Sequence, residues 1–346
     1  MTVVNRQVRL RFDTGAVEAL THVNLSAVRS DGRYLWIAGD ETATVERLTA
    51  DEIGRPTEYA EHVTFPLPAV IKLPGEAHEE VDVEGLARVG PYLWAVGSHS
   101  SKRKKLKRDH SDAKSAKRLA SVSAEPSRRV LARLAIENDE PVSETCDGHR
   151  SAALGRPGLI DLLEDDDHLA PFLAIPGKDN GLDIEGIAAA GEPGEERVFL
   201  GLRGPVLRGW AVILQLAPRA DGNELKLDKV DGGRYVKHFI DIDGLGVRDL
   251  CVQGDDLLIL AGPSMDLDGP VRVYRWRGAA DLRASDVVHR EELERVLDLP
   301  YGEGDDHAEG IALLPDNELL VVYDSPARSR LTEPDVVLAD VVTLPS

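Results

Sequence analysis

Charged side chains recur at matching positions along the sequence, each time beside a small or apolar residue. The recurring segments are Asp82-Val-Glu-Gly-Leu, Asp183-Ile-Glu-Gly-Ile, Gly246-Val-Arg-Asp-Leu and His307-Ala-Glu-Gly-Ile. Carboxylates that lie close together must take up a proton, bind a cation or pair with a base. The sequence therefore predicts ligand binding or catalysis wherever the fold gathers these segments.

Two kinds of ligand suit these residue types. Carboxylates from separate segments, with carbonyl oxygens and waters, suit a hard cation such as Ca²⁺ or Mg²⁺. Arginine and histidine suit a phosphate or carboxylate ligand, and histidine can transfer a proton near neutral pH. The predicted metal ligands are Asp82, Glu84, Asp183, Glu185 and Glu309.

The elements that must position these residues are repeated pairs of short apolar runs. Turn residues such as Ser30-Asp31-Gly32 join the two runs of a pair, which is typical of a β-hairpin. The paired runs lie at 24–28 and 34–40, 82–86 and 92–98, 183–187 and 198–201, 246–250 and 257–262, and 307–311 and 319–324. A third run follows each pair, and weaker candidates for a fourth strand lie at 62–65, 172–175, 238–242 and 295–299.

Four short strands per repeat predict the blades of an all-β propeller. Five antiparallel blades are visible within one domain at 1–346, and Val8–Phe12 is expected to complete the last blade and close the ring. The long second repeat, with a loop and short helix expected at about 146–170, leaves a degenerate sixth blade open. A two-sheet sandwich is the alternative, because it shares the even spacing of strands.

Antiparallel pairing brings the start of each first strand and the end of the second strand to the same end of a blade. The expected result is one mouth of a central channel, lined with ionisable groups, to which the ends of the second strands add Asp40 and Glu41 among others. The candidate catalytic residues are Glu84, Glu185, Glu309, His99 and His307. The candidate ligand-binding residues are Arg203, Arg248, Asp249, Ser98, Arg103, Asp324 and Ser325.

Each carboxylate also has a structural interpretation. Acidic residues at strand starts can cap turns and tie neighbouring blades together, and the glycine that follows can permit tight packing at the axis. The change from Glu84 and Glu185 to Arg248 at the equivalent position favours a specific ligand, because a purely structural repeat does not require it.

A basic segment, Ser101–Arg118, interrupts the second repeat. It contains nine Lys or Arg residues and two Asp residues. Runs of like charge usually repel one another and stay mobile, so we expect a solvated loop within an insertion at about 100–128. Because the segment directly follows Ser98-His99-Ser100, it should emerge at the mouth, with Arg103 the member expected to act.

The composition limits the class of protein. A net charge of −20 argues against general binding to nucleic acids, although a local basic site remains possible. Two cysteines give no disulfide framework, and neither a leader sequence nor a membrane span is apparent. We therefore expect a cytoplasmic protein, with a monomer favoured.

Several of these motifs together resemble a known bacterial family. Asp82-Val-Glu-Gly-Leu, Gly97-Ser-His-Ser, Asp183-Ile-Glu-Gly-Ile, Gly201-Leu-Arg-Gly-Pro, Leu245-Gly-Val-Arg-Asp-Leu and Val322-Tyr-Asp-Ser are similar to the pattern of domain-of-unknown-function family 3616 (DUF3616). The resemblance spans nearly the whole chain and implies a propeller-like domain, but it supplies no reaction. The Glu-Gly-Ile strand starts are more distantly similar to those of phytase-like and esterase-like propellers.

Two main functions fit the sequence. The first is a hydrolase, metal-assisted through Ca²⁺ or Mg²⁺, that acts on a small phosphate or carboxylate ester at the mouth. The second is a non-catalytic scaffold that binds a polar ligand or a protein loop there. A third hypothesis makes the acidic rim a surface for a basic partner.

Overall fold

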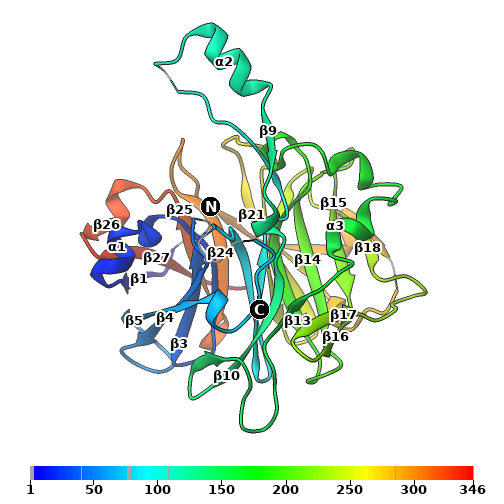
Figure 1. Ribbon diagram of the computed structural model, residues 1–346. Coiled ribbons are helices and arrows are strands. Elements are labelled where there is room, and N and C mark those ends of the chain that lie inside the picture. The colour runs from blue at the N-terminus through cyan, green and yellow to red at the C-terminus, as the bar shows by residue number, and fades with distance from the viewer. Residues whose placement is uncertain (1–3, 40, 76–78, 108, 285, 346) are drawn as a thin grey trace.

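Strands dominate the structure and helices are short (Figure 1). The structure is a computed structural model that describes residues 4–39, 41–75, 79–107, 109–284 and 286–345. Asp40, one of the residues expected at the mouth, lies outside the described residues. The described part contains no helix that is long and apolar enough to cross a membrane.

Most described strands form five antiparallel four-stranded units, named here unit 1 to unit 5. Unit 1 contains β2 (Leu25–Ser30), β3 (Tyr34–Gly39), β4 (Thr44–Ala50) and β5 (Glu58–Pro66). Unit 2 contains β6 (Val83–Val89), β7 (Tyr92–Gly97), β10 (Leu131–Glu137) and β12 (Ala152–Leu154). Unit 3 contains β13 (Asp183–Ala190), β14 (Arg197–Gly204), β15 (Trp210–Leu216) and β18 (Val236–Asp241). Unit 4 contains β19 (Gly246–Gln253), β20 (Asp256–Gly262), β21 (Val271–Trp276) and β23 (Leu293–Leu299). Unit 5 contains β24 (His307–Leu314), β25 (Glu318–Asp324), β27 (Val336–Thr343) and β1 (Arg6–Arg11).

Turn chemistry explains the hairpin that opens unit 1. Gly32 has a φ of +93°, a conformation that glycine adopts without steric cost. Asp31 fixes the turn, because its carboxylate accepts hydrogen bonds from the backbone N–H of Tyr34 (3.3 Å) and from the indole N–H of Trp36 (2.8 Å). The polar residues between two apolar runs therefore specify where the chain reverses.

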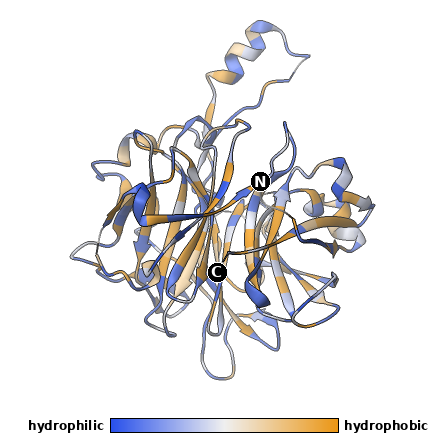
Figure 2. Ribbon diagram, turned by 180° about the vertical axis from the view of Figure 1, so that it is seen from behind, coloured by the Kyte–Doolittle hydropathy of each residue, from blue (hydrophilic) through white to orange (hydrophobic). Residues whose placement is uncertain are grey.

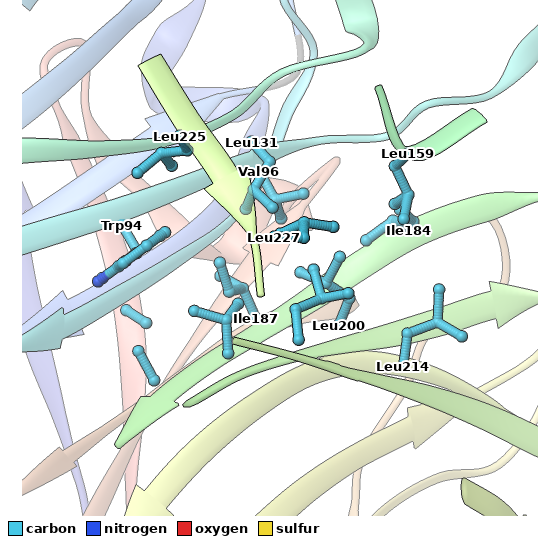
Figure 3. Packing of buried hydrophobic residues seen from close by; sticks show 14 of the residues in the cluster. Trp94, Val96, Leu131, Leu159, Ile184, Ile187, Leu200, Leu214, Leu225 and Leu227 are labelled. Atoms are coloured by element: carbon cyan, nitrogen blue, oxygen red, sulfur yellow. The ribbon is translucent and has the colours of Figure 1, made fainter. Parts of the chain in front are cut away.

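The core is divided into layers between neighbouring units. Along β7, Tyr92, Trp94 and Val96 pack toward unit 3, whereas Leu93 and Ala95 pack toward unit 1, as the alternation of side chains in a strand requires. Figure 3 shows the cluster between units 2 and 3. In the described part of the chain, equivalent clusters lie between each of the other neighbouring pairs, including units 5 and 1. Each unit thus contributes apolar surface to two layers.

The first strands of the units contact one another in a cycle. β2 contacts β6, β6 contacts β13, β13 contacts β19, β19 contacts β24, and β24 contacts β2. The N-terminal β1 pairs antiparallel with β27 along Arg6–Arg11 and also pairs parallel with β5. The two ends of the chain therefore share one sheet, and the architecture is all-β and propeller-like.

Unit 2 differs from the sequence prediction. The candidate fourth strand at 172–175 is wrong, because 3₁₀ helix η4 (Ala170–Phe172) begins that segment and β12 is the fourth strand. The Asp166 carboxylate explains part of the difference, since it accepts the backbone N–H groups of His168 and Leu169 and so starts a turn there. Residues 150–167 contain β12 and the short helix α3 (Leu159–Leu163) rather than another four-stranded unit.

The basic segment is also more regular than expected. Instead of a solvated loop, it forms the strand pair β8 (Ser101–Arg103) and β9 (Val122–Ala124), with helix α2 (Asp112–Leu119) between them. The Ser111 hydroxyl caps α2 by accepting the backbone N–H of Lys114. Figure 1 shows that this hairpin stands away from the rest of the chain, and α2 has no buried residue.

The remaining elements lie around the units. They include β11 (Glu140–Val142), β16 (Pro218–Asp221), β17 (Glu224–Leu227), β22 (Asp286–Val288), β26 (Leu331–Glu333) and α1 (Thr14–Glu18). The other 3₁₀ helices are η1 (Thr21–Val23), η2 (Leu67–Ala69), η3 (Pro126–Arg128), η5 (Gly177–Asp179), η6 (Ala279–Asp281), η7 (Arg290–Glu292), η8 (Pro315–Asn317) and η9 (Arg328–Arg330). Figure 2 shows hydrophobic residues along the strands and hydrophilic residues in many of the connecting loops.

Candidate functional site

A β-bulge interrupts the first strand of every unit at the same place. Between the first and second strands the pairing register shifts by one residue, and a bulge of this kind redirects the side chain of the extra residue. The five extra residues are Ser26, Glu84, Glu185, Arg248 and Glu309. These are residues that the sequence repeat placed at the mouth, so the bulges give them a common structural origin.

A glycine follows the bulge in three of the units, and its role is steric. A Cβ atom at Gly85 would lie 2.8 Å from Cγ2 of Ile187 and 3.1 Å from the carbonyl oxygen of Glu185. A Cβ atom at Gly186 would meet Asp249 and Leu250 of the next unit at about the same distances. The first strands can approach one another closely at the axis only because these side chains are missing, as the structural interpretation of the glycines anticipated.

A chain of ion pairs joins units 3, 4 and 5 at these bulges. Nη1 of Arg203, the extra residue in a second bulge on β14, lies 2.7 Å from Oε1 of Glu185. Nη1 of Arg248 lies 3.2 Å from Oε2 of Glu185 and 2.6 Å from Oε1 of Glu309. Glu185 and both arginines are buried, with at most 7% of each residue exposed. The predicted residues Glu185, Glu309, Arg203 and Arg248 are therefore brought together.

The surroundings of the two glutamates shift their pKa values in opposite directions. Burial acts to raise the pKa of Glu185, but the charges of Arg203 and Arg248 outweigh it and lower that pKa below the usual range. Burial raises the pKa of Glu309 to about 8, since Arg248 only partly offsets it and Asp324 and Glu185 raise it further. Glu185 is therefore held as an anion, whereas the raised pKa of Glu309 allows it to carry a proton near neutral pH.

Asp183 is the most unusual carboxyl at this mouth. It is 5% exposed, and among the described residues it has no side-chain hydrogen bond or ion pair. The backbone of Gly177 lies close to its carboxyl group, since a Cβ atom at Gly177 would be 2.5 Å from Oδ2. Burial raises the pKa of Asp183 to about 7, and the nearby charge of Glu185 adds to the increase. Such a group is close to half ionised at neutral pH.

Lys178 is a member of this site that the sequence repeats did not reveal. It lies on η5, outside the strands, and its residue is exposed. Desolvation and the charge of Arg203 act to lower the pKa of Lys178, but Glu309, Asp266 and Glu185 outweigh them and raise it. Its only sequence signal is its position five residues before Asp183, in a loop that the repeat pattern leaves unassigned.

Asp82 and Ser98 lie in a separate part of the same mouth. Asp82 forms an ion pair of 2.5 Å with Arg128, a buried residue that the sequence analysis did not identify. Burial raises the pKa of Asp82 despite that charge. The Ser98 hydroxyl hydrogen-bonds to that of Ser100 at 3.0 Å. Glu84, on the neighbouring bulge, is half-buried.

His99 is buried and neutral. Its Nδ1 lies 2.8 Å from the carbonyl oxygen of Gly97, which can only accept, so Nδ1 carries the proton and Nε2 is left as an acceptor. Burial lowers the pKa of His99 to about 4, which makes this imidazole a poor proton donor at pH 7. In the described part of the chain, no hydrogen bond joins Ser98 or Ser325 to a histidine.

Several other predicted residues point to partners at the edge of the mouth. His307 contacts Asp268 at 3.3 Å, and Ser325 donates to Asp324 at 3.3 Å. Arg103 forms a 2.6 Å ion pair with Asp179 on η5. These residues surround the site, but they pair with Asp268, Asp324 and Asp179 instead of the glutamates and arginines of the ion-pair chain.

Asp249 departs from the predicted ligand-binding set. It is fully buried and pairs with Arg29, whose Nη2 and Nη1 lie 2.7 and 2.8 Å from its two carboxylate oxygens. Arg29 also donates to the carbonyl oxygens of Val28, Ile187, Leu250 and Ile311, which belong to units 1, 3, 4 and 5. Asp249 follows the bulge at the position that Gly85 and Gly186 hold in other units, and Arg29 binds its carboxylate there. This pair is a structural link at the axis.

The predicted metal site does not match this geometry. In the part of the chain that the structure describes, no three carboxylate, imidazole or thiol side chains are placed to hold a metal ion together. Arg203 and Arg248 explain this for Glu185, because they bind both of its carboxylate oxygens, and Arg248 also binds Oε1 of Glu309. Asp82 is likewise taken by Arg128.

Solved structures of other proteins show a weak likeness to this chain along most of its length. Similar solved structures include glutaminyl cyclase from Myxococcus xanthus, with a TM-score of 0.45, 11% identity and coverage of 100% of this chain and 97% of that chain. Streptogramin B lyase has a TM-score of 0.38 with 8% identity, covering 98% of each chain. A putative oxidoreductase (glucose dehydrogenase) from Thermus thermophilus has a TM-score of 0.38 with 13% identity, covering 93% of this chain and 98% of that chain. Sequence identities this low give no information about the activity of this chain.

No curated protein matches the sequence. The profile of one family, described as "Protein of unknown function (DUF3616)", matches residues 24–340. That match covers most of the chain, from the start of unit 1 to the last strand of unit 5, and the chain belongs to the DUF3616 family.

Proposed function

We propose that the chain is a five-bladed propeller that binds a small anionic ester at the mouth formed by the bulges and hydrolyses it by acid–base catalysis. Asp183 carries the proposal. A buried carboxyl without a protein partner is costly unless a ligand, water or proton compensates it. With a pKa of about 7, Asp183 can accept a proton and return it at neutral pH.

Glu309 supplies the complementary acid. Its pKa of about 8 keeps it protonated when Asp183 is already partly ionised. Two carboxyl groups with separated pKa values can divide the roles of base and acid. In the proposed reaction Asp183 takes a proton from water, the water oxygen bonds to the ester centre, and Glu309 gives its proton to the departing alkoxide oxygen.

Arg248 and Lys178 would hold the anionic group of the substrate. Nη1 of Arg248 is engaged by Glu185 and Glu309, whereas its Nε and Nη2 donate to no acceptor among the described residues. Those free donors belong to a buried guanidinium, where a charge-assisted hydrogen bond to a ligand is strong. Lys178 adds a second cation beside the same glutamates.

Glu185 and Arg203 act as positioning residues in this proposal. Besides its bond to Glu185, Arg203 donates from Nε to the carbonyl oxygen of Ser264 at 3.1 Å and from Nη2 to that of Met265 at 3.3 Å. Each nitrogen of Arg203 therefore donates to a protein group, and the bond from Nη1 fixes the carboxylate that orients Arg248.

A non-catalytic binding site is the second candidate. The observation that favours it is the complete engagement of Glu185 and Arg203 by protein groups, which makes that half of the mouth a rigid anchor. In that case Arg248 and Lys178 would bind an anion, but Asp183 would transfer no proton.

Chromogenic esters test the catalytic proposal. The hydrolysis of 4-nitrophenyl hydrogen succinate and 4-nitrophenyl phosphate is measured against that of neutral 4-nitrophenyl acetate, from pH 5 to 9. We expect a preference for an anionic ester and a bell-shaped profile of kcat/KM with limbs near 7 and 8. Asp183→Asn should lower kcat by roughly 10²–10⁴-fold and remove the acidic limb.

The control is Asp255→Asn, which changes an exposed carboxylate in the β19–β20 turn. It should leave the rates of ester hydrolysis unchanged. A thermal unfolding transition of each variant shows that both are folded. Hydrolysis by Asp183→Asn at the wild-type rate would overturn the role of Asp183. Saturable binding of the anionic esters without turnover by the wild type would replace catalysis by the second candidate.

A further inference from the structure

A sizeable cavity in the described part of the chain lies away from the mouth. It has a volume of about 540 Å³ and lies beside unit 2, between β10, β12, β17 and the residues that lead into α3. None of the carboxylates or arginines of the ion-pair chain lines it. Its size is that of pockets that enclose small organic ligands.

The floor of this cavity is apolar. Val130 and Leu131 come from the start of β10, and Leu159 begins α3; all three are buried. Leu154 and Ile160 extend the same surface and are half-buried. Figure 3 shows Leu131 and Leu159 in the cluster between units 2 and 3, so the floor is the outer edge of a packed core and is held rigidly.

The walls are basic, although the protein as a whole is strongly acidic. Lys72, Arg129 and Arg156 come from three separate loops, and none forms an ion pair or side-chain hydrogen bond with a described residue. The acidic residues of the walls are already engaged, because Glu224 pairs with Lys226 at 2.7 Å and Asp161 accepts the backbone N–H of Gly158 at 2.8 Å. The free charge that faces the cavity is therefore positive.

An apolar floor under a cationic wall selects for a particular kind of molecule. A free inorganic anion would gain nothing from Leu131 and Leu159, and a purely apolar molecule would leave the cations unpaired. The lining carries four cations and two carboxylates, so this wall has an excess of positive charge in a chain with a net charge of −20.

We propose that this cavity is a second binding site, for an organic anion that has an apolar body and a carboxylate or phosphate head group. The apolar body lies against Leu131, Leu154 and Leu159, and the head group lies between Lys72, Arg129 and Arg156. The site is independent of the reaction proposed at the mouth.

Octanoate and octan-1-ol are suitable probes, because they have the same carbon chain and differ in charge. Binding to the full chain is measured by isothermal titration calorimetry, with the melting temperature as a second readout. Octanoate should bind saturably and raise the melting temperature, whereas octan-1-ol and inorganic phosphate at equal concentration should not. Arg156→Gln and Lys72→Gln should each weaken octanoate binding by about tenfold, and Arg156→Lys should retain most of it.

Matched variants localise the effect. Arg55→Gln removes an exposed arginine in the β4–β5 turn and should bind octanoate as the wild type does. Asp183→Asn should do the same, which separates this site from the mouth. The proposal is overturned if octan-1-ol binds as well as octanoate, if Arg156→Gln and Lys72→Gln bind like the wild type, or if Arg55→Gln loses as much affinity as they do.

Discussion

Replacing Arg29 by methionine should destabilise the protein far more than replacing any exposed arginine. Arg29→Met keeps most of the side-chain length but removes the charge and every donor. It leaves Asp249, which is fully buried, without the guanidinium that lies 2.7 and 2.8 Å from its oxygens. It also removes the donors to four backbone carbonyl oxygens from four units.

The size of the effect follows from the geometry. Breaking a buried ion pair by removal of one partner costs about 3–5 kcal/mol, because the remaining charge is left uncompensated. Unfolding entropies of about 2.1 cal/mol/K per residue give about 0.7 kcal/mol/K for 346 residues. The melting temperature should therefore fall by about 4–7 °C.

The pH dependence has a defined sign. Burial raises the pKa of Asp249 in the folded state, and Arg29 lowers it. An acid whose folded pKa is raised contributes its full stability below the unfolded pKa, and that stability is lost as the pH rises through the folded value. Without Arg29 the folded pKa rises further, so the deficit of Arg29→Met should be small at pH 5 and largest at pH 8.

Chemical and thermal denaturation followed by circular dichroism measure this directly. Arg55→Met is the exposed control and should match the wild type within about 0.5 kcal/mol. Arg29→Met/Asp249→Asn should recover a large part of the loss, because no buried charge then remains. The reasoning is refuted if Arg29→Met lies within about 1 kcal/mol of the wild type at pH 8, or if the two substitutions are simply additive.

Three further predictions concern other parts of the chain. The folded pKa of Asp183, raised by burial to about 7, predicts that the wild type loses stability relative to Asp183→Asn between pH 5 and pH 8; parallel stability curves of the two proteins would contradict this. Replacing 104–120 by a short Gly-Ser linker should change the free energy of unfolding by no more than about 0.5 kcal/mol, because α2 has no buried residue. A larger loss in denaturant titrations would show that the hairpin contributes to the core. Deleting 1–11 should lower the free energy of unfolding by at least about 3 kcal/mol, because Val8 and Leu10 are fully buried. Deletion of 1–3 is the control. Equal stability of the two truncated proteins would refute a closing role for β1.

The strands were predictable because their signal is local. Alternating apolar residues and turn residues such as Asp31-Gly32 placed the first three strands of every unit. The fourth-strand candidates at 62–65 and 295–299 lie within β5 and β23, and the candidate at 238–242 overlaps β18. The segment at 172–175 has a similar apolar composition but begins as a 3₁₀ helix. Composition alone did not separate the two outcomes, since the Asp166 turn just before the segment competes with a strand.

The site was predictable only as a set of candidates. The repeat identified Glu185, Arg248 and Glu309 as equivalent, and they do occupy equivalent bulges. It grouped Asp249 with Arg248, although the bulge separates them and directs Asp249 to Arg29. Arg29 itself gave no signal, because it lies at the far end of its strand from the polar positions of the repeat and its partner is 220 residues away.

The sequence by itself determined the order of the strands, the recurrence of the polar positions and the acidic charge of the chain, because these depend on neighbouring residues and on composition. Only the tertiary structure decided which charges pair. Glu185 is held as an anion because two arginines from two units reach it, whereas Asp183, two residues away, is left buried and unpaired under Gly177. Protonation depends on burial and on the distance to other charges, and both are set by contacts between units that lie far apart in the sequence.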